Sequence, residues 1–242
     1  MNAQHYRSLL PRNDQRVYDR ILESWKNKRE TVVIEPPCST HNRIETIVEY
    51  VAFDHPAMFH VDYYHFEQTI SLFYTKLTFR FFHSREQIFK AERDIERWVE
   101  YVSSHLPTQA RQQDKLWLIY DYIARQVSYQ ERGHGLSHTV LGCLPQYGHA
   151  AVCEGTSKGF KMLCDAVNLP CIIISGFVTN NGRTERHAWN MVEINGITRH
   201  IDVTAEIMRA HIFGKAEQNR FLKCDVEMQC YQWERHIHPS CA

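Results

Sequence analysis

The first half of the chain alternates between helical patterns and one segment with the composition of strands. The clearest helix is predicted from Ser84 to His105, where apolar residues recur every three or four positions and Ser84 and Gln87 suit a capping box. Residues 60–82 are rich in Tyr, Phe, Thr and Val, which favours a β-hairpin. Three further helices are predicted over residues 14–30, 39–53 (after a break at Pro36-Pro37) and 109–127.

The second half of the chain predicts a helix followed by antiparallel strands. The expected elements are a glycine-containing loop (133–148), a helix (153–168) and three strands (171–178, 187–194 and 197–204). The last two strands are joined by Asn195-Gly196, a pair that strongly favours a two-residue hairpin turn. A helix followed by antiparallel strands indicates an α+β fold rather than a doubly wound sheet.

The predicted hairpin places a histidine and an aspartate on one side of the sheet. If Asn195-Gly196 form the turn, the numbers of paired residues sum to 391, so Trp189 faces Asp202. His187 lies two residues before Trp189 and therefore points to the same face. His187 and Asp202 are then diagonal neighbours, close enough for the carboxylate to orient the imidazole.

Cys153 supplies the other half of a possible catalytic group. It stands at the predicted start of a helix, where backbone N–H groups and the helix dipole favour an anion such as a thiolate. A thiolate beside an imidazole that a carboxylate holds is the Cys-His-Asp form of nucleophilic catalysis. A cysteine at a helix start and a histidine on a strand are each more often packing residues. The residues alone leave both interpretations open.

Composition and charge narrow the class of protein. The chain has 242 residues, of which 43% are hydrophobic and 23% charged, as in globular proteins. Basic and acidic residues number 28 each, so the basic excess typical of nucleic-acid binding is absent. The sequence has no run of about 18 apolar residues and no apolar stretch near its start, so we expect no membrane span and a cytoplasmic location.

The eight cysteines are expected to serve mainly as core residues. In a reducing compartment they need not form disulfides, and the sequence contains no CxxC pair of the kind that binds structural zinc. His236, His238 and Cys241 near the end offer three possible metal ligands with no fourth nearby in sequence. We therefore predict no metal site.

Four short motifs surround the three candidate positions. They are Val152-Cys153-Glu154-Gly155, Ile174-Ser175-Gly176, His187-Ala188-Trp189-Asn190 and Asp202-Val203-Thr204. In type and order they resemble the transglutaminase-like superfamily, which shares the papain-like cysteine protease fold. The resemblance is specific from about Leu116 to Thr204. Outside that range, the N-terminal half and residues 221–229 resemble bacterial stand-alone members more loosely.

The chain departs from the family pattern at three places. Ala151 stands where the family commonly has Gly, and Ile197-Thr198-Arg199-His200 replaces a strand that often carries a Trp-Tyr pair. Ala205-Glu206 stands where bacterial members often have Trp-Asp. These changes bear on the choice of substrate more than on catalysis.

The resemblance implies both an architecture and a reaction. It implies a transglutaminase-like, papain-like catalytic core over residues 109–242, with an N-terminal mainly helical and β-hairpin extension over residues 1–108. Cys153, His187 and Asp202 would be catalytic, attacking an amide of a peptide or a glutamine side chain and forming a thioester. We expect a peptidase or amidase, because water needs no second binding site. A protein-glutamine transglutaminase and a non-catalytic peptide-binding module are the alternatives.

Three further residues are candidates for contact with the substrate. Trp189 either walls the site beside His187 or belongs to the core. His138 lies in the loop before Cys153 and can contact substrate or assist the oxyanion, or it is an ordinary surface histidine. Glu154 either lines the site or caps the helix as an acid in its first turn.

The expected chemistry also limits the partners. We expect a protein or peptide substrate, with no nucleic acid and no membrane partner. The reaction requires no metal or organic cofactor, and calcium is not implied, since the sequence shows no clustered acidic loop. The oligomeric state is not predicted.

Overall fold

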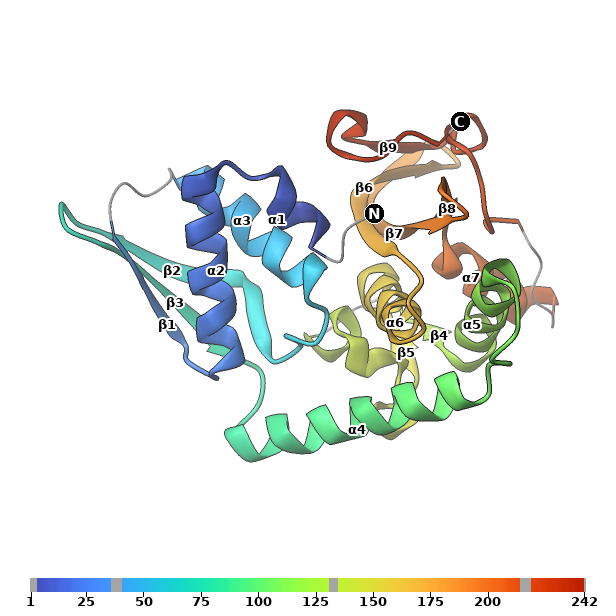
Figure 1. Cartoon of the computed structure of the whole chain (residues 1–242), viewed down its shortest axis with the longest axis horizontal. Coiled ribbons are helices and arrows are strands. Elements are labelled where there is room, and N and C mark those ends of the chain that lie inside the picture. The colour runs from blue at the N-terminus through green and yellow to red at the C-terminus, as the bar shows by residue number, and fades with distance from the viewer. Residues whose placement is uncertain (1–3, 36–40, 131–134, 214–218, 242) are drawn as a thin grey trace. The chain divides into compact units, whose positions relative to one another are not determined.

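The structure is a computed structural model that describes residues 4–35, 41–130, 135–213 and 219–241 (Figure 1). The Pro36-Pro37 break and the first residues of the predicted loop 133–148 lie outside the described residues. The chain divides into two compact units, Asn2–Glu92 and Arg93–Ala242, which are described separately below. This division falls inside helix α4 (Arg85–Ser104). The domain boundary after residue 108 stays a prediction.

The unit Asn2–Glu92 packs helices beside a three-stranded antiparallel sheet. Its elements are α1 (His5–Leu9), α2 (Arg12–Lys26), β1 (Thr31–Ile34), α3 (His41–Asp54), β2 (Val61–Ile70), β3 (Thr75–Phe81) and the start of α4. The strand order is β1-β3-β2, so the hairpin predicted over residues 60–82 is confirmed. The helix predicted over residues 14–30 was too long, because the chain turns after Lys26 and residues 31–34 add an edge strand.

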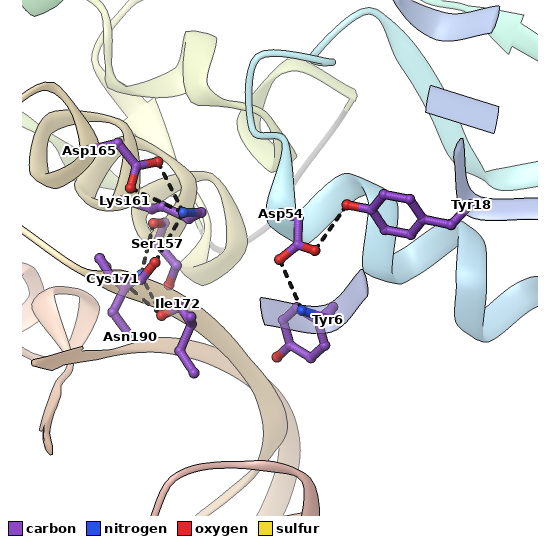
Figure 2. Close-up of polar contacts among 9 residues, drawn as sticks. All are labelled: Tyr6, Tyr18, Asp54, Ser157, Lys161, Asp165, Cys171, Ile172 and Asn190. Carbon is purple, nitrogen blue, oxygen red and sulfur yellow. Dashed lines mark hydrogen bonds and ion pairs between the residues drawn. The ribbon is translucent and has the colours of Figure 1, made fainter. Parts of the chain in front are cut away.

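One buried carboxylate ties the helices of this unit together. Asp54, at the end of α3, accepts hydrogen bonds from the N–H groups of Tyr6 and Arg7 in α1, at 3.2 and 3.0 Å. It also accepts the hydroxyl of Tyr18 in α2, at 2.9 Å (Figure 2). Asp54 thereby satisfies N–H groups of the first turn of α1, which have no partner within their own helix.

The unit Arg93–Ala242 has an α+β fold, as expected. Its helices and strands are α4, α5 (Gln112–Gln126), β4 (Ser128–Tyr129), β5 (Ala150–Ala151), α6 (Cys153–Ala166), β6 (Cys171–Asn180), β7 (Arg183–Ile194), β8 (Ile197–Ile201), α7 (Val203–Phe213) and β9 (Tyr231–Trp233). The described part of the loop before β5 forms three 3₁₀ turns, Gly135–His138, Val140–Cys143 and Pro145–Tyr147. Strands β8-β7-β6-β9 make one antiparallel sheet, and α6 packs against β6 and β7.

Local sequence signals determine several of these elements. The capping box before α4 is present, since Ser84 N–H donates to Gln87 Oε1 at 2.8 Å and Gln87 N–H donates to Ser84 Oγ at 3.3 Å. The hairpin register is confirmed, with Ile194 paired to Ile197 and a turn in which Asn195 and Gly196 have φ of 52° and 78°. Both positive angles are those of a type I′ turn.

The last part of the predicted third strand was wrong. Strand β8 ends at Ile201, and helix α7 begins at Val203. Asp202 lies between them, and its Oδ1 accepts the N–H of Ala205 at 3.2 Å. Aspartate is a favoured N-cap residue, so the residue expected on the strand instead begins a helix. Among the described residues, no helix combines the length and apolar character needed to cross a membrane.

Candidate active site

Helix α6 is held against the sheet by buried polar side chains. The amide nitrogen of Asn190 on β7 donates to the carbonyls of Ser157 and Ile172, at 3.1 and 3.3 Å. Lys161 Nζ donates to the carbonyl of Cys171 at 3.0 Å and pairs with Asp165 at 2.9 Å (Figure 2). Because Cys153 is the first residue of α6, these contacts also fix its position relative to β7.

The glycine of the Cys-Glu-Gly motif is required by a close chain approach. A Cβ on Gly155 would lie 2.2 Å from the carbonyl oxygen of Ser137 and 2.8 Å from that of Thr139. The same loop is bound to the start of α6, since Val152 N–H donates to the Ser137 carbonyl at 3.1 Å. A side chain at position 155 would therefore push the 135–138 turn away from Cys153.

The sheet brings His187 and Asp202 together. His187 on β7 has its Nε2 at 2.8 Å from Oδ2 of Asp202, the pairing expected from the hairpin register. The His187 side chain is 12% exposed and that of Asp202 only 1%. The carboxylate also accepts the Tyr231 hydroxyl at Oδ2, at 2.6 Å, and the Ala205 N–H at Oδ1. Asp202 is thus a buried charge whose two oxygens are fully engaged.

The electrostatics link the three sequence-predicted positions through His187. Burial alone would lower the pKa of His187, but the charge and hydrogen bond of Asp202, with a hydrogen bond to the Cys153 side chain, raise it to about 10. Since Nε2 of His187 faces Asp202, its Nδ1 is the nitrogen left for Cys153. Burial would raise the pKa of Asp202, yet that pKa is lowered because His187, Tyr231 and the Ala205 N–H all favour the charged carboxylate. The arrangement can therefore hold an imidazolium next to the thiol.

Trp189 lies beside His187 and is completely buried. Its ring is stacked on that of His187, with centroids 6.0 Å apart and planes 17° apart. The indole Nε1 donates to Nδ1 of His200 at 3.0 Å, and Nε2 of His200 lies 3.0 Å from Oδ1 of Asp225. Trp189 is thus both a core residue and a neighbour of His187. Its contact with substrate stays a prediction.

Glu154 and His138 contact each other next to Cys153. One carboxylate oxygen of Glu154 pairs with Lys158, and the other lies 3.0 Å from Nδ1 of His138. Lys158 also donates to the His138 carbonyl at 3.2 Å. The Glu154 side chain is 5% exposed, whereas that of His138 is 40% exposed. His138 is therefore the more exposed of the two side chains. The roles of both residues toward substrate stay predictions.

The structure also gathers three residues that sequence reasoning did not connect. The donor atoms of His200, Asp225 and Cys241 lie within 4.8 Å of one another. A metal at this position would need the lone pair of His200 Nε2. Because Nδ1 of His200 accepts the indole N–H, and indole can only donate, Nε2 must carry the proton of the neutral ring. Burial and the nearby charge of Asp225 raise the pKa of the Cys241 thiol to about 12, so it stays protonated. The group fits a hydrogen-bond chain better than a cation site.

Comparison with known proteins finds a family match over part of the chain. Residues 90–203 match the family described as the transglutaminase-like superfamily. No curated protein matches the chain.

Three solved structures are similar at low identity. One, from Cytophaga hutchinsonii and provisionally named a cysteine protease, is 12% identical with a TM-score of 0.39, covering 58% of this chain and 61% of its own. A structure named only as a TGase is 13% identical with a TM-score of 0.38, covering 72% and 50%. A provisionally named protease of Parabacteroides distasonis is 7% identical with a TM-score of 0.34, covering 56% and 35%. This chain spans less than two thirds of each of these three proteins. What the comparisons show is therefore a match of residues 90–203 to the transglutaminase-like superfamily.

Proposed function

We propose that this protein is a cysteine-dependent acyl-transfer enzyme that acts on amides. Cys153 is the nucleophile, His187 the general base and acid, and Asp202 the residue that orients the imidazole. The observation that carries the proposal is the 2.8 Å contact between His187 and the buried Asp202, at an imidazole whose pKa is also raised by Cys153. The match of residues 90–203 to the transglutaminase-like superfamily, whose members are generally cysteine-dependent enzymes, supports it.

The first half of the reaction forms a thioester. The Cys153 sulfur attacks the carbonyl carbon of a peptide bond or a glutamine side chain, and the carbonyl π electrons move to oxygen. The C–N bond then breaks as the imidazolium of His187 gives its proton to the leaving nitrogen. Imidazolium is the favoured form of His187 at neutral pH, since its pKa is raised to about 10. The N–H of Cys153, in the first turn of α6, has no carbonyl partner within that helix and can donate to the oxyanion.

Hydrolysis completes the cycle. Water attacks the thioester carbonyl while neutral His187 accepts its proton, and the C–S bond breaks to release a carboxylic acid and the Cys153 thiolate. Transfer of the same acyl group to a primary amine would make the protein a transglutaminase. Water requires no second binding site, so we assign a peptidase or amidase activity on a protein or peptide substrate. Among the predicted substrate contacts, the exposed ring of His138 is the best placed.

The activated thiol is tested by the rate of Cys153 alkylation with iodoacetamide between pH 4 and 9, read by peptide mass spectrometry. We expect fast labelling that persists well below pH 8 and falls at least about tenfold in His187→Ala, because the imidazolium stabilises the thiolate. The partly exposed thiols of Cys224 and Cys230 serve as internal references. His65→Ala is the matched control, since His65 also pairs with an aspartate (Asp62, 3.1 Å) but lies in the other unit.

Equal labelling of Cys153 in wild type and His187→Ala would reject the proposal. If labelling behaves as expected, a peptide library is the next substrate, with and without a primary amine. A new carboxylate product identifies a hydrolase, and an amine adduct identifies a transglutaminase. A Cys153→Ala protein that keeps its full cellular effect would instead point to a peptide-binding module.

A further inference from the structure

The C-terminal segment, residues 219–241, is bound to both edges of the sheet that carries His187. On one side, β9 pairs with β6, with Trp233 opposite Gly176 and Tyr231 opposite Val178. On the other side, Lys223 exchanges two backbone hydrogen bonds with His200 of β8, at 2.8 and 2.9 Å. Figure 1 shows this segment in red beside β6 and β8. It lies entirely beyond residue 203, where the family match ends.

Gly176 makes the approach of β9 possible. A Cβ at this position would lie 2.2 Å from the carbonyl oxygen of Gln232 and 3.0 Å from the ring of Trp189. Any other residue would force the backbone of β9 away from β6. The glycine of the motif Ile174-Ser175-Gly176 therefore allows the C-terminal segment to pack against β6.

A first hydrogen-bond route runs from this segment to Asp202. The Tyr231 hydroxyl donates at 2.6 Å to Oδ2, the same oxygen that accepts His187. The phenol is a donor over a wide pH range, because burial and the charge of Asp202 raise the pKa of Tyr231. The backbone contributes as well, since Asp202 N–H donates to the Arg220 carbonyl at 2.9 Å.

A second route runs from the segment to Trp189. Asp225 accepts from Nε2 of His200, and Nδ1 of His200 accepts the indole N–H of Trp189. Burial lowers the pKa of His200, so its ring is neutral at neutral pH, as this sequence of donors and acceptors requires. Trp189 in turn stacks on His187. The imidazole of His187 therefore contacts Asp202 at its edge and Trp189 on its face. Residues 219–241 contact Asp202 directly and Trp189 through His200.

We propose that the C-terminal segment is a positioning element of the active site, in which Tyr231 orients Asp202 and the His200–Asp225 pair orients Trp189. The proposal rests on the proposed function of Cys153, His187 and Asp202. Tyr231 acts through Asp202 and also packs edge-on against the ring of His187, with centroids 5.8 Å apart. Asp225 acts through His200 and then Trp189, which stacks on His187.

The first route is tested with Tyr231→Phe, which removes only the hydroxyl. The phenol stabilises the charged form of Asp202, so its loss raises the pKa of that carboxyl, and the pair with His187 breaks at a higher pH. We expect the acid limb of the Cys153 alkylation profile to move upward by about 0.5 to 1 pH unit, which is a three- to tenfold slower rate at a fixed acidic pH.

Tyr120→Phe is the matched control for this experiment. Tyr120 is an equally buried tyrosine of the same unit whose hydroxyl donates to a buried carboxylate, Glu206, at 3.0 Å. We expect its profile to coincide with that of wild type. The proposal is wrong if the Tyr231→Phe profile also coincides with wild type, or if both variants move equally. Ordinary thiol behaviour in wild type would instead reject the proposed function, so the two failures are distinguishable.

The second route is tested on the unmodified protein by ¹⁵N NMR of its histidine rings. We expect His200 to be neutral with its proton on Nε2, its signals identified by their loss in His200→Gln. A proton on Nδ1, or a doubly protonated ring at pH 7, would overturn this route, because neither form can accept the indole N–H. This readout does not depend on turnover, and it remains available if Tyr231→Phe fails to fold.

Discussion

Each compact unit contains a buried aspartate that accepts N–H groups from the first turn of a helix and also accepts a tyrosine hydroxyl. Asp54 binds two N–H groups of α1 and the hydroxyl of Tyr18 (Figure 2). Asp202 binds an N–H group of α7 and the hydroxyl of Tyr231. In both cases, fixed donors satisfy a carboxylate that burial would otherwise destabilise.

Asp202 is bound to a partner that can carry a proton. Asp202 accepts His187 on the oxygen that Tyr231 also uses, and His187 reaches on to Cys153. The donors to Asp54 come from two helices, so this carboxylate anchors α1 and α2 to the end of α3. The carboxylate of Asp202 also holds the proton on the imidazole of His187. In the proposed function, the carboxylate that orients His187 is therefore one that also caps helix α7.

Asp202→Asn and Asp54→Asn should differ strongly in the rate at which Cys153 is alkylated. Asp202→Asn removes the counter-ion of the imidazolium, so we expect the alkylation of Cys153 at pH 6 to slow at least about tenfold. Asp54→Asn should leave that rate within about twofold of wild type while destabilising its own unit. Alkylation rates with circular dichroism as a folding control make the comparison. Equal loss of thiol reactivity in both variants would remove the functional distinction between the two aspartates.

Gly176→Ala should affect Asp202 indirectly, with both Asp202 and Tyr231 kept in the sequence. Gly176→Ala should displace β9 and cost about 1–3 kcal/mol in the free energy of unfolding. Because the Tyr231 hydroxyl moves with β9, the acid limb of the alkylation profile should shift upward, as in Tyr231→Phe. Gly182→Ala is the control, since Gly182 has φ of 76° in an open turn and its Cβ would meet no atom within 4 Å. That variant should lose some stability through backbone strain while its alkylation profile stays unchanged.

Tyr18→Phe and Tyr231→Phe should lower the stability of the protein to a similar extent, but only one of them should change the reactivity of Cys153. A hydrogen bond to a charged, buried carboxylate contributes about 1.5–3 kcal/mol, so Tyr18→Phe and Tyr231→Phe should each lower the urea midpoint. Tyr18→Phe should also speed hydrogen exchange at the N–H groups of Tyr6 and Arg7, which share the Asp54 carboxylate. Only Tyr231→Phe should change the alkylation profile. A changed profile in Tyr18→Phe would contradict this assignment.

The last prediction is a pH dependence of the free energy of unfolding that His187 provides. Its folded pKa of about 10 lies above the ordinary value of 6.5, so the folded state binds the proton more tightly than the unfolded chain. The stabilisation is therefore complete below about pH 6.5 and fades as the pH rises through 10. We expect the difference in unfolding free energy between wild type and His187→Gln to shrink from pH 6 to pH 10. A difference that stays constant or grows would argue against a charged imidazole beside Asp202.

Local patterns were sufficient to predict the central part of the site. The type I′ turn at Asn195-Gly196 determined the register, and the register placed His187 near Asp202. The start of α6 at Cys153 was also predicted from the periodicity of its apolar residues. These features depend on neighbours within a few residues, where turn geometry and helix periodicity leave few alternatives. The same local rules did not foresee that Asp202 would leave the strand and begin α7.

The amino-acid sequence is enough to select Cys153, His187 and Asp202 as candidates and to predict the hairpin that aligns two of them. The groups that support these residues could be found only in the folded protein. Tyr231 is 29 residues from Asp202, and Asp225 is 25 residues from His200. No periodicity connects such positions, because their contact depends on how β9 and the preceding turns close against the sheet. Buried polar groups need hydrogen-bond partners, and the packing of the whole folded chain determines which groups lie close enough to serve.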